Sequence, residues 1–502
     1  MNKLVSIIIL LGFIFSKCNL PSFNNELNHK EKGVTVKDLF EEIYNGKELC
    51  DPTSKAYLLN GSMGLPQAQN ISGAFTANHD IDTTVLVNFL QHEADIFSWE
   101  TFIAINWPSA DGENPDSTMC FDGPKKAVWE GWMPSHRIFK ENGDAPDEWP
   151  YESSNSQIDE LRVFGKVNLG LDDLSNMDSV DADNYPVIDK NGNYVLYEIY
   201  YNKEAYNYIL DGKLYSKAGQ KEFVKTWPDV TSGLTVFTTD STGRTDTMNI
   251  EKEYMRAYFP IGNIKDSIEV VKEGNNIKTY SFSTGTGAMI IKTAWVILNS
   301  DEDHSSFYTR NINAGNRAIK IGLVGMHMAH KIAESTQWVW STFEHKSNAP
   351  DMVDGNVSFK LSNYTFFDEK NDVFSLYNKP PEVRYQPDKS ERKSTQVVRL
   401  LPSQKNTMQV DRFFNELIQR SNESSVWLNY RLVGTQWPLN PDLFTSGSMY
   451  QPQLLGNAIL ETYQQGESSC MGCHRQARFL YKGTDVKGGY SADFIYGLNS
   501  AE

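Results

Sequence analysis

Long apolar runs in the middle of the chain have the composition and spacing of buried β-strands. Residues 285–298 and 319–332 are apolar stretches bounded by glycine and polar residues, and the first is rich in β-branched side chains. A third run, residues 338–345, alternates so that its two tryptophans share one face of a strand, whereas Val339 and Phe343 share the other. These runs predict strands in the core of a β-rich region.

A tight turn is expected within residues 186–195. The pair Asn191-Gly192 favours a two-residue hairpin turn, because both residues tolerate positive φ. Residues 195–201 then carry an apolar or aromatic side chain at every second position, as a half-buried strand does. The sequence therefore predicts a hairpin followed by a strand.

Helical spacing appears toward both ends of the chain. Residues 36–44, 85–104, 410–418 and 454–463 carry apolar side chains three and four positions apart, which predicts four helices. Pro108 limits the second of these on its carboxyl side.

The order of these elements predicts an α+β fold. Dense strands with Gly, Asn and Asp turns favour a sandwich or twisted antiparallel sheets in a β-rich main region, residues 36–390, which also includes the N-terminal helices. A polar, charged and proline-containing stretch at 379–393 marks a boundary. Beyond it, residues 391–502 are expected to form a helical subdomain.

The amino terminus has the features of an export signal. A lysine at position 3 precedes an 11-residue apolar run, residues 5–15, which is too short to cross a bilayer. We expect residues 1–17 to be the signal and residues 18–35 to be a polar tether. The protein is therefore expected to be exported.

Cys18 follows the apolar run at the place where a lipoprotein cysteine is acylated, although Lys17 stands where a small residue is usual. Acylation would anchor the protein to a membrane, whereas cleavage by an ordinary signal peptidase would release it. Both alternatives stay open, so the expected location is the periplasm, either free or as a membrane-tethered lipoprotein.

The strongest chemical signal is Cys470-Met471-Gly472-Cys473-His474, a CxxCH motif. Two thiols at this spacing can add to the two vinyl groups of a porphyrin, and the adjacent imidazole then falls beneath the ring as an iron ligand. The motif predicts one covalently bound haem c, held by Cys470 and Cys473, with His474 on the metal.

Two other interpretations of the motif are poorer. A zinc site needs four ligands, and the chain has no second pair of closely spaced cysteines. A redox CxxC pair belongs early in a βαβ unit, whereas this motif lies close to the carboxyl end.

Cysteine usage leaves one further pair. Of five cysteines, two belong to the motif and Cys18 is the candidate lipid site, so Cys50 and Cys120 remain. In an oxidising compartment such a pair favours a disulfide over two free thiols. We therefore predict a Cys50–Cys120 disulfide.

Size and charge narrow the function classes. The chain has 502 residues, enough for two or three domains and far more than a small electron carrier needs. Its net charge of −17 argues against nucleic acid, which needs a basic surface. An acidic surface could steer a basic redox partner.

The second axial ligand of the iron has to precede the motif in the chain, because the 28 residues after His474 contain no Met and no His. The candidates are His327, His330 and Met449, or the position is open. On a strand, His327 would face opposite to His330, so at most one of them could point at the iron.

An open position would permit chemistry on O₂, NO or peroxide. For peroxide chemistry a distal base is required, and His345 is a candidate because the neighbouring Glu344 could orient it.

Three segments resemble a known family. Residues 99–108, 340–350 and 457–474 are similar to large exported bacterial proteins called "cytochrome c family protein", which carry a single C-terminal haem site. The resemblance spans about residues 36–480. It implies covalent haem at Cys470 and Cys473 with His474 on the iron.

Two classes of function follow from the motif. The first is an exported single-haem c-type cytochrome that transfers electrons to or from a partner protein. The alternative is a haem enzyme, peroxidase-like or oxidase-like, or a gas-binding haem protein with an open distal site, for which the additional length would supply a pocket.

Overall fold

The structure is a computed structural model. It describes Leu49 and most of the chain from residue 83 onward, with gaps at residues 124, 151–184, 227–233, 240–244, 251–256, 258, 261–267, 272–276, 281–285, 301–303, 315–316, 333–334, 384, 387, 439–449 and 481–488. The predicted export signal (1–17), tether (18–35) and first helix (36–44) lie outside the described residues.

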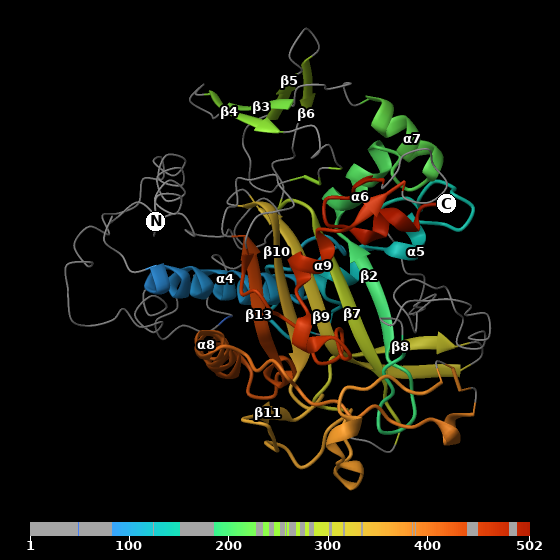
Figure 1. The fold of residues 1–502 in the computed structure, drawn as a ribbon, viewed down its shortest axis with the longest axis vertical. Helices are drawn as coiled ribbons and strands as arrows, with labels where there is room; N and C mark the ends of the chain where they lie inside the picture. Colours follow the sequence, from blue (N-terminus) through green and yellow to red (C-terminus); the bar gives the residue numbers. More distant parts are fainter. Residues whose placement is uncertain are drawn as a thin grey trace, which may run out of the picture.

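The centre of the molecule is an eight-stranded antiparallel sheet with the order β1-β2-β7-β9-β10-β13-β14, in which β8 pairs with β9 (Figure 1). Its strands are β1 (Met133–Pro134), β2 (Leu196–Tyr201), β7 (Met289–Ile297), β8 (Thr309–Ala314), β9 (Arg317–Ile332), β10 (Ser335–His345), β13 (Tyr430–Pro438) and β14 (Tyr450–Gln451). The strands expected at 195–201, 285–298, 319–332 and 338–345 are confirmed as β2, β7, β9 and β10. The α+β class with a β-rich main region is likewise confirmed.

Both faces of this sheet are covered, and β10 shows how the sequence assigns them. Val339 and Phe343 pack into apolar clusters on one face, with residues of the long helix α4. Trp338 and Trp340 pack on the other face, in a cluster that includes Cys470. The predicted alternation of this strand is therefore confirmed.

One face carries two helices, α4 (Thr83–Ile105) and α8 (Lys405–Ser421), which confirm the helices expected at 85–104 and 410–418. The ring of Trp99 on α4 lies 5.0 Å from that of Phe343 and 5.5 Å from that of Phe414 on α8. Ser98 Oγ also contacts Ser341 Oγ at 2.7 Å in the sheet. Aromatic packing and buried hydroxyl bonds thus fix this helical layer.

The opposite face is covered by the C-terminal segment, residues 452–480 and 489–502, which crosses the front of the sheet in Figure 1 (red). The helix expected at 454–463 is wrong, because this stretch forms turns. The side chain of Asn457 accepts from the backbone N–H of Ile459 at 2.9 Å and donates to Thr342 Oγ1 at 2.9 Å. The apolar residues of this stretch pack against the sheet, so their helix-like spacing in the sequence reflects tertiary packing.

The remaining elements surround this core. The shorter helices are α5 (Ser135–Ile138), α6 (Lys203–Asp211), α7 (Lys217–Thr226) and α9 (Cys470–His474). The smaller sheets contain β3 (Leu234–Thr239), β4 (Thr245–Ile250), β5 (Ile268–Val271), β6 (Ile277–Tyr280), β11 (Asp351–Val353), β12 (Asn356–Ser358), β15 (Arg478–Phe479) and β16 (Tyr490–Ser491). The 3-10 helices are η3 (Val128–Gly131), η6 (Glu369–Asn371), η7 (Phe374–Leu376), η8 (Lys389–Glu391), η9 (Val426–Asn429), η10 (Gln465–Glu467) and η11 (Tyr496–Ser500).

The predicted hairpin is also present. Ile188 and Tyr194 form an antiparallel bridge across a turn in which Gly192 has φ 76°. The carboxylate of Asp189 accepts from the backbone N–H groups of Asn191 and Asn193, at 2.8 and 2.7 Å, which closes the turn. None of the helices in the described ranges is long and apolar enough to cross a bilayer.

A buried carboxyl between the helices and the sheet makes stability depend on pH. Asp95 on α4 accepts from Thr407 Oγ1 on α8 at 2.7 Å and from Gln91 Nε2 at 3.0 Å. Burial raises the pKa of Asp95 from 3.8 to about 7, against the lowering effect of these bonds. The folded state therefore binds this proton more tightly than the unfolded chain, and the associated stability is lost as pH rises from 4 to 7.

Replacing Asp95 with asparagine is expected to remove that loss. Urea unfolding of D95N and of the wild type at pH 4, 5.5 and 7.5 should show the difference in unfolding free energy moving in favour of D95N as pH rises. A difference that does not change with pH would contradict the raised pKa.

Candidate haem-attachment site

The CxxCH motif forms a short helix, α9, that is fixed to the sheet at its first turn. Ser469 precedes the helix, and its Oγ accepts from the backbone N–H of Gly472 at 3.0 Å. Gln436 on β13 accepts from the backbone N–H of Met471 at 2.6 Å and hydrogen-bonds Ser469. A helix N-cap and one strand side chain thus position the motif.

The two thiols of the motif lie in different environments. Cys470 is buried in the apolar cluster around Trp340, whereas Cys473 is exposed. Burial raises the pKa of the Cys470 thiol. Neither thiol is in a disulfide. One attachment point would therefore face the protein core and the other the surface.

His474 is held in the protonation state that a metal ligand needs. Its Nδ1 lies 2.7 Å from the carbonyl oxygen of Phe494. Because a carbonyl can only accept, Nδ1 carries the hydrogen and Nε2 keeps its lone pair. Burial lowers the pKa of His474 to about 4, so the ring is neutral at physiological pH. This is the arrangement of a ligating histidine whose other nitrogen is fixed by a backbone carbonyl.

Two aromatic side chains flank the imidazole of His474. The ring of Trp340 lies 4.3 Å away and that of Tyr496 lies 5.3 Å away. The hydroxyl of Tyr496 donates to the carbonyl of Cys473 at 3.0 Å. Trp340 is 4% exposed, yet its Nε1 is buried without a hydrogen-bond partner among the described residues. An orphaned donor beside the motif is consistent with a polar group, such as a haem propionate, that completes this site.

His327 lies on the face of the sheet that carries the motif. It stands between Lys292 on β7 and Thr342 on β10 in the strand register. Its Nε2 lies 3.3 Å from Glu461 Oε2, in the segment that covers this face. The charges of His327, Lys292 and Glu461 all influence the pKa of His474, so these groups share one electrostatic environment.

His330, the second histidine of β9, does not lie there. His330 faces the helical layer, where it stacks on Phe97 at 5.4 Å and its Nε2 lies 2.8 Å from the carbonyl of Thr286. It is therefore removed as a ligand on the side of His474. Met449 lies outside the described residues.

The expectation that Glu344 orients His345 is wrong. His345 stacks on Phe307 at 4.2 Å, and its Nε2 lies 2.9 Å from the carbonyl of Ser306. Glu344 points to the opposite face of β10, where its carboxylate binds Arg399. Adjacent residues of a strand face opposite ways, so the two side chains cannot form a pair.

Cys120 takes part in a disulfide. Because Cys50 lies outside the described residues, the pairing of Cys120 with Cys50 stays a prediction. The neighbouring Leu49 is buried, and its backbone N–H donates to Ser421 Oγ on α8 at 2.7 Å.

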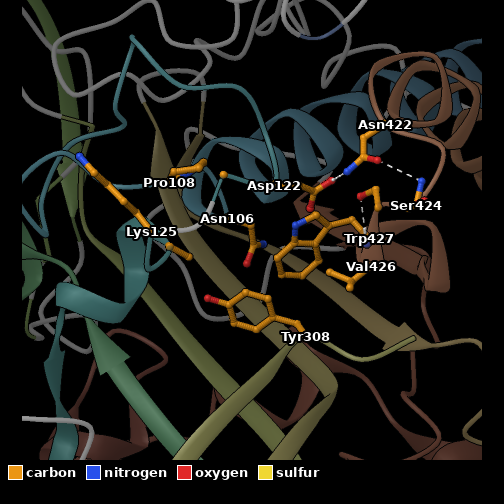
Figure 2. A pocket seen from close by; sticks show the side chains of 12 residues that line it. Asn106, Pro108, Asp122, Lys125, Tyr308, Asn422, Ser424, Val426 and Trp427 are labelled. Carbon is orange, nitrogen blue, oxygen red and sulfur yellow. Dashed lines mark hydrogen bonds between the residues drawn. The ribbon is translucent and has the colours of Figure 1, made fainter. Parts of the chain in front are cut away.

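A separate cavity of about 250 Å³ lies beside η9, away from the motif. Figure 2 shows Trp427 and Tyr308 on one side of it and Asp122 beside Asn422. Asn422 Nδ2 donates to Asp122 Oδ2 at 3.3 Å, and the Tyr308 hydroxyl hydrogen-bonds Glu130. These polar groups are thus paired within the protein, and no sequence motif marks the cavity.

No protein-family model, curated protein or solved structure matches this chain. Within the described residues, no group of three or more His, Cys, Asp and Glu side chains could hold a metal ion by itself. The candidate site therefore depends on the motif and on the geometry around His474. Of the groups at this site, the sequence predicted Cys470, Cys473, His474 and the candidate His327, and missed Trp340, Glu461 and the Phe494 carbonyl.

Proposed function

We propose that this protein is an exported c-type cytochrome that carries one covalently bound haem and transfers electrons. Cys470 and Cys473 would attach the porphyrin, and His474 would bind its iron. The observation that carries the proposal is the 2.7 Å contact between His474 Nδ1 and the Phe494 carbonyl, which leaves Nε2 free at the end of a CxxCH helix. When bound, the haem supplies a one-electron redox couple.

The surroundings of the motif suit electron transfer. Cys470, Met471 and Trp340 lie in an apolar cluster, and an apolar environment raises the reduction potential of a haem and limits access of water. Cys473 is exposed, so one edge of the group would be within reach of a partner protein. The net charge of −17 favours a redox partner with a basic docking surface.

A haem enzyme or gas-binding protein is the second candidate, and one observation favours it. The His327–Glu461 pair lies on the same face as His474, and an imidazole with a carboxylate is a suitable acid–base pair for peroxide chemistry. The two candidates differ in what His327 does. If His327 binds the iron, electron transfer is favoured, and if it stands free beside an open position, the enzyme is favoured.

The proposed location is the periplasm, with membrane tethering through a lipidated Cys18 as one alternative. The sequence of residues 1–18 supports this proposal. Covalent attachment of haem c outside the cytoplasm agrees with export.

The proposal is tested by expressing the full chain in a host that attaches c-type haem. We expect one haem mass on the peptide that contains residues 470–474, together with haem-dependent colour after denaturing electrophoresis. C470A/C473A should lose both signals completely. M471L, which changes the same helix but keeps both thiols and the histidine, should retain them. Colourless wild-type protein with no added mass would refute the proposal.

A further inference from the structure

Strand β9 presents one of its two histidines to the side of the sheet that carries the motif. The even-numbered side chains Met326, Met328 and His330 face the helical layer. His327 faces the C-terminal segment, together with Lys292 of the neighbouring strand. Of the two candidate ligands that the structure describes, it is therefore His327, and not His330, that lies on the same side of the sheet as His474.

A carboxylate from the segment that carries the motif lies beside the ring of His327. Glu461 Oε2 lies 3.3 Å from His327 Nε2, and the same oxygen accepts from the backbone N–H of Asn457 at 2.8 Å. Asn457 is itself fixed to β10 through Thr342 and Phe343. The position of the carboxylate is thus set by the fold rather than by chance contact of two long side chains.

The imidazole of His327 is bonded differently from the imidazoles of the other two histidines on β9 and β10. Its side chain is 11% exposed, and its Nε2 makes no hydrogen bond of good geometry within the described residues. By contrast, His330 and His345 each contact a backbone carbonyl and stack on a phenylalanine. A nearly buried histidine with one ring nitrogen facing a carboxylate is the arrangement of a ligand whose ring a carboxylate orients.

We propose that His327 is the second axial ligand of the haem iron and that Glu461 orients its ring. One nitrogen of the imidazole would face the carboxylate, which leaves the other for the metal. This inference depends on the proposed haem attachment at Cys470 and Cys473. It makes the cofactor bis-histidine, which leaves electron transfer as its chemistry.

The spin state of the iron tests the inference directly. Ferric wild-type protein should be low-spin by absorption and electron paramagnetic resonance, and the ferrous form should bind CO slowly or not at all. H327G and H327Q should become high-spin and bind CO quickly, and added imidazole should restore the low-spin spectrum of H327G. H330Q, a change on the opposite face of the same strand, should stay low-spin.

The role of Glu461 is tested by the reduction potential of the haem, which would not change if Glu461 only supported the fold. E461Q should keep the low-spin spectrum and the attached haem but have a higher reduction potential, because an imidazole without a carboxylate partner is a weaker donor to ferric iron. An unchanged potential would overturn the positioning role of Glu461.

Failure of the inference and failure of the proposed function give different results. Wild-type protein without covalent haem would refute the proposed function. Wild-type protein with covalent haem that is high-spin, or an H327Q variant that carries haem and stays low-spin, would overturn His327 as the ligand. The high-spin result would also favour the enzyme over the electron carrier.

Discussion

Replacing Glu344 with glutamine is expected to lower the free energy of unfolding by about 3–5 kcal/mol, the usual cost of removing one partner from a buried ion pair. Glu344 is fully buried and accepts from Arg399 at 2.5 Å and from Arg431 at 2.9 Å. Both arginines also bind Asp351, at 2.6 and 3.2 Å. Loss of one carboxylate would leave the two guanidinium groups with a single anion between them.

The effect of E344Q should depend on pH. Burial alone would raise the pKa of Glu344, but Arg399 and Arg431 lower it below its ordinary value of 4.5. The stability that the charge contributes is therefore fully present above about pH 4.5 and is lost as pH falls through the folded pKa. Urea unfolding at pH 7 and at pH 3.5 should show a smaller difference between E344Q and the wild type at the lower pH.

Two control variants separate charge balance from general damage. E344Q/R399M removes one charge of each sign, so it should be less destabilised than the two single variants together. K217Q removes an exposed ion pair, Lys217–Glu502 at 3.7 Å, and should change the unfolding free energy by no more than about 1 kcal/mol. Additive effects of E344Q and R399M would contradict a coupled network.

The elements that the sequence predicted well are those in which local pattern and tertiary packing agree. Residues 319–332 and 338–345 form central strands with a helical layer on one face and the C-terminal segment on the other. Successive side chains are therefore buried alternately against these two layers. The period of two along a strand then decides which residues share a face. The same period correctly predicts that His327 and His330 lie on opposite faces of β9.

The failures come from contacts between residues far apart in the chain. The turns at 454–463 are stabilised by Asn457, which bonds to Thr342 and Phe343 of β10, and no local pattern shows those partners. The ion pair between Glu344 and Arg399 also joins residues far apart in the chain. Glu344 forms this pair instead of the expected contact with His345. Sequence spacing describes one element at a time, whereas these bonds join different layers.

At the candidate site, too, some groups could be predicted from local sequence and others could not. The two thiols and the imidazole that we propose as haem ligands stand out in the sequence because covalent attachment would require a fixed spacing of adjacent residues. The acceptor of His474 could not, because it is a backbone carbonyl at Phe494, and any residue type supplies such a group. The residue before Phe494 belongs to a buried ion pair between distant residues, Lys331 and Asp493.

Replacing Lys331 with methionine is expected to disturb both folding and the candidate haem site. Lys331 and Asp493 are 0% and 1% exposed, and their charged groups lie 2.5 Å apart. Asp493 also accepts from the backbone N–H of Phe259 and, through its carbonyl, from Trp338 Nε1. The residue that follows Asp493 is Phe494, whose carbonyl holds His474. K331M should therefore lower the free energy of unfolding by about 3–5 kcal/mol, since it leaves a buried carboxylate unpaired.

The same change should reach the haem, provided that the cofactor is attached as proposed. A looser Phe494 carbonyl weakens its bond to the Nδ1 hydrogen of His474, which makes the imidazole a poorer donor to ferric iron and raises the reduction potential. K331M/D493N, in which both charges are removed, should recover part of the stability measured by urea unfolding. Potentiometric titration of the two variants then shows whether the reduction potential changes together with the stability. A variant that loses stability but keeps the wild-type potential would show that the ion pair supports the fold without positioning the ligand.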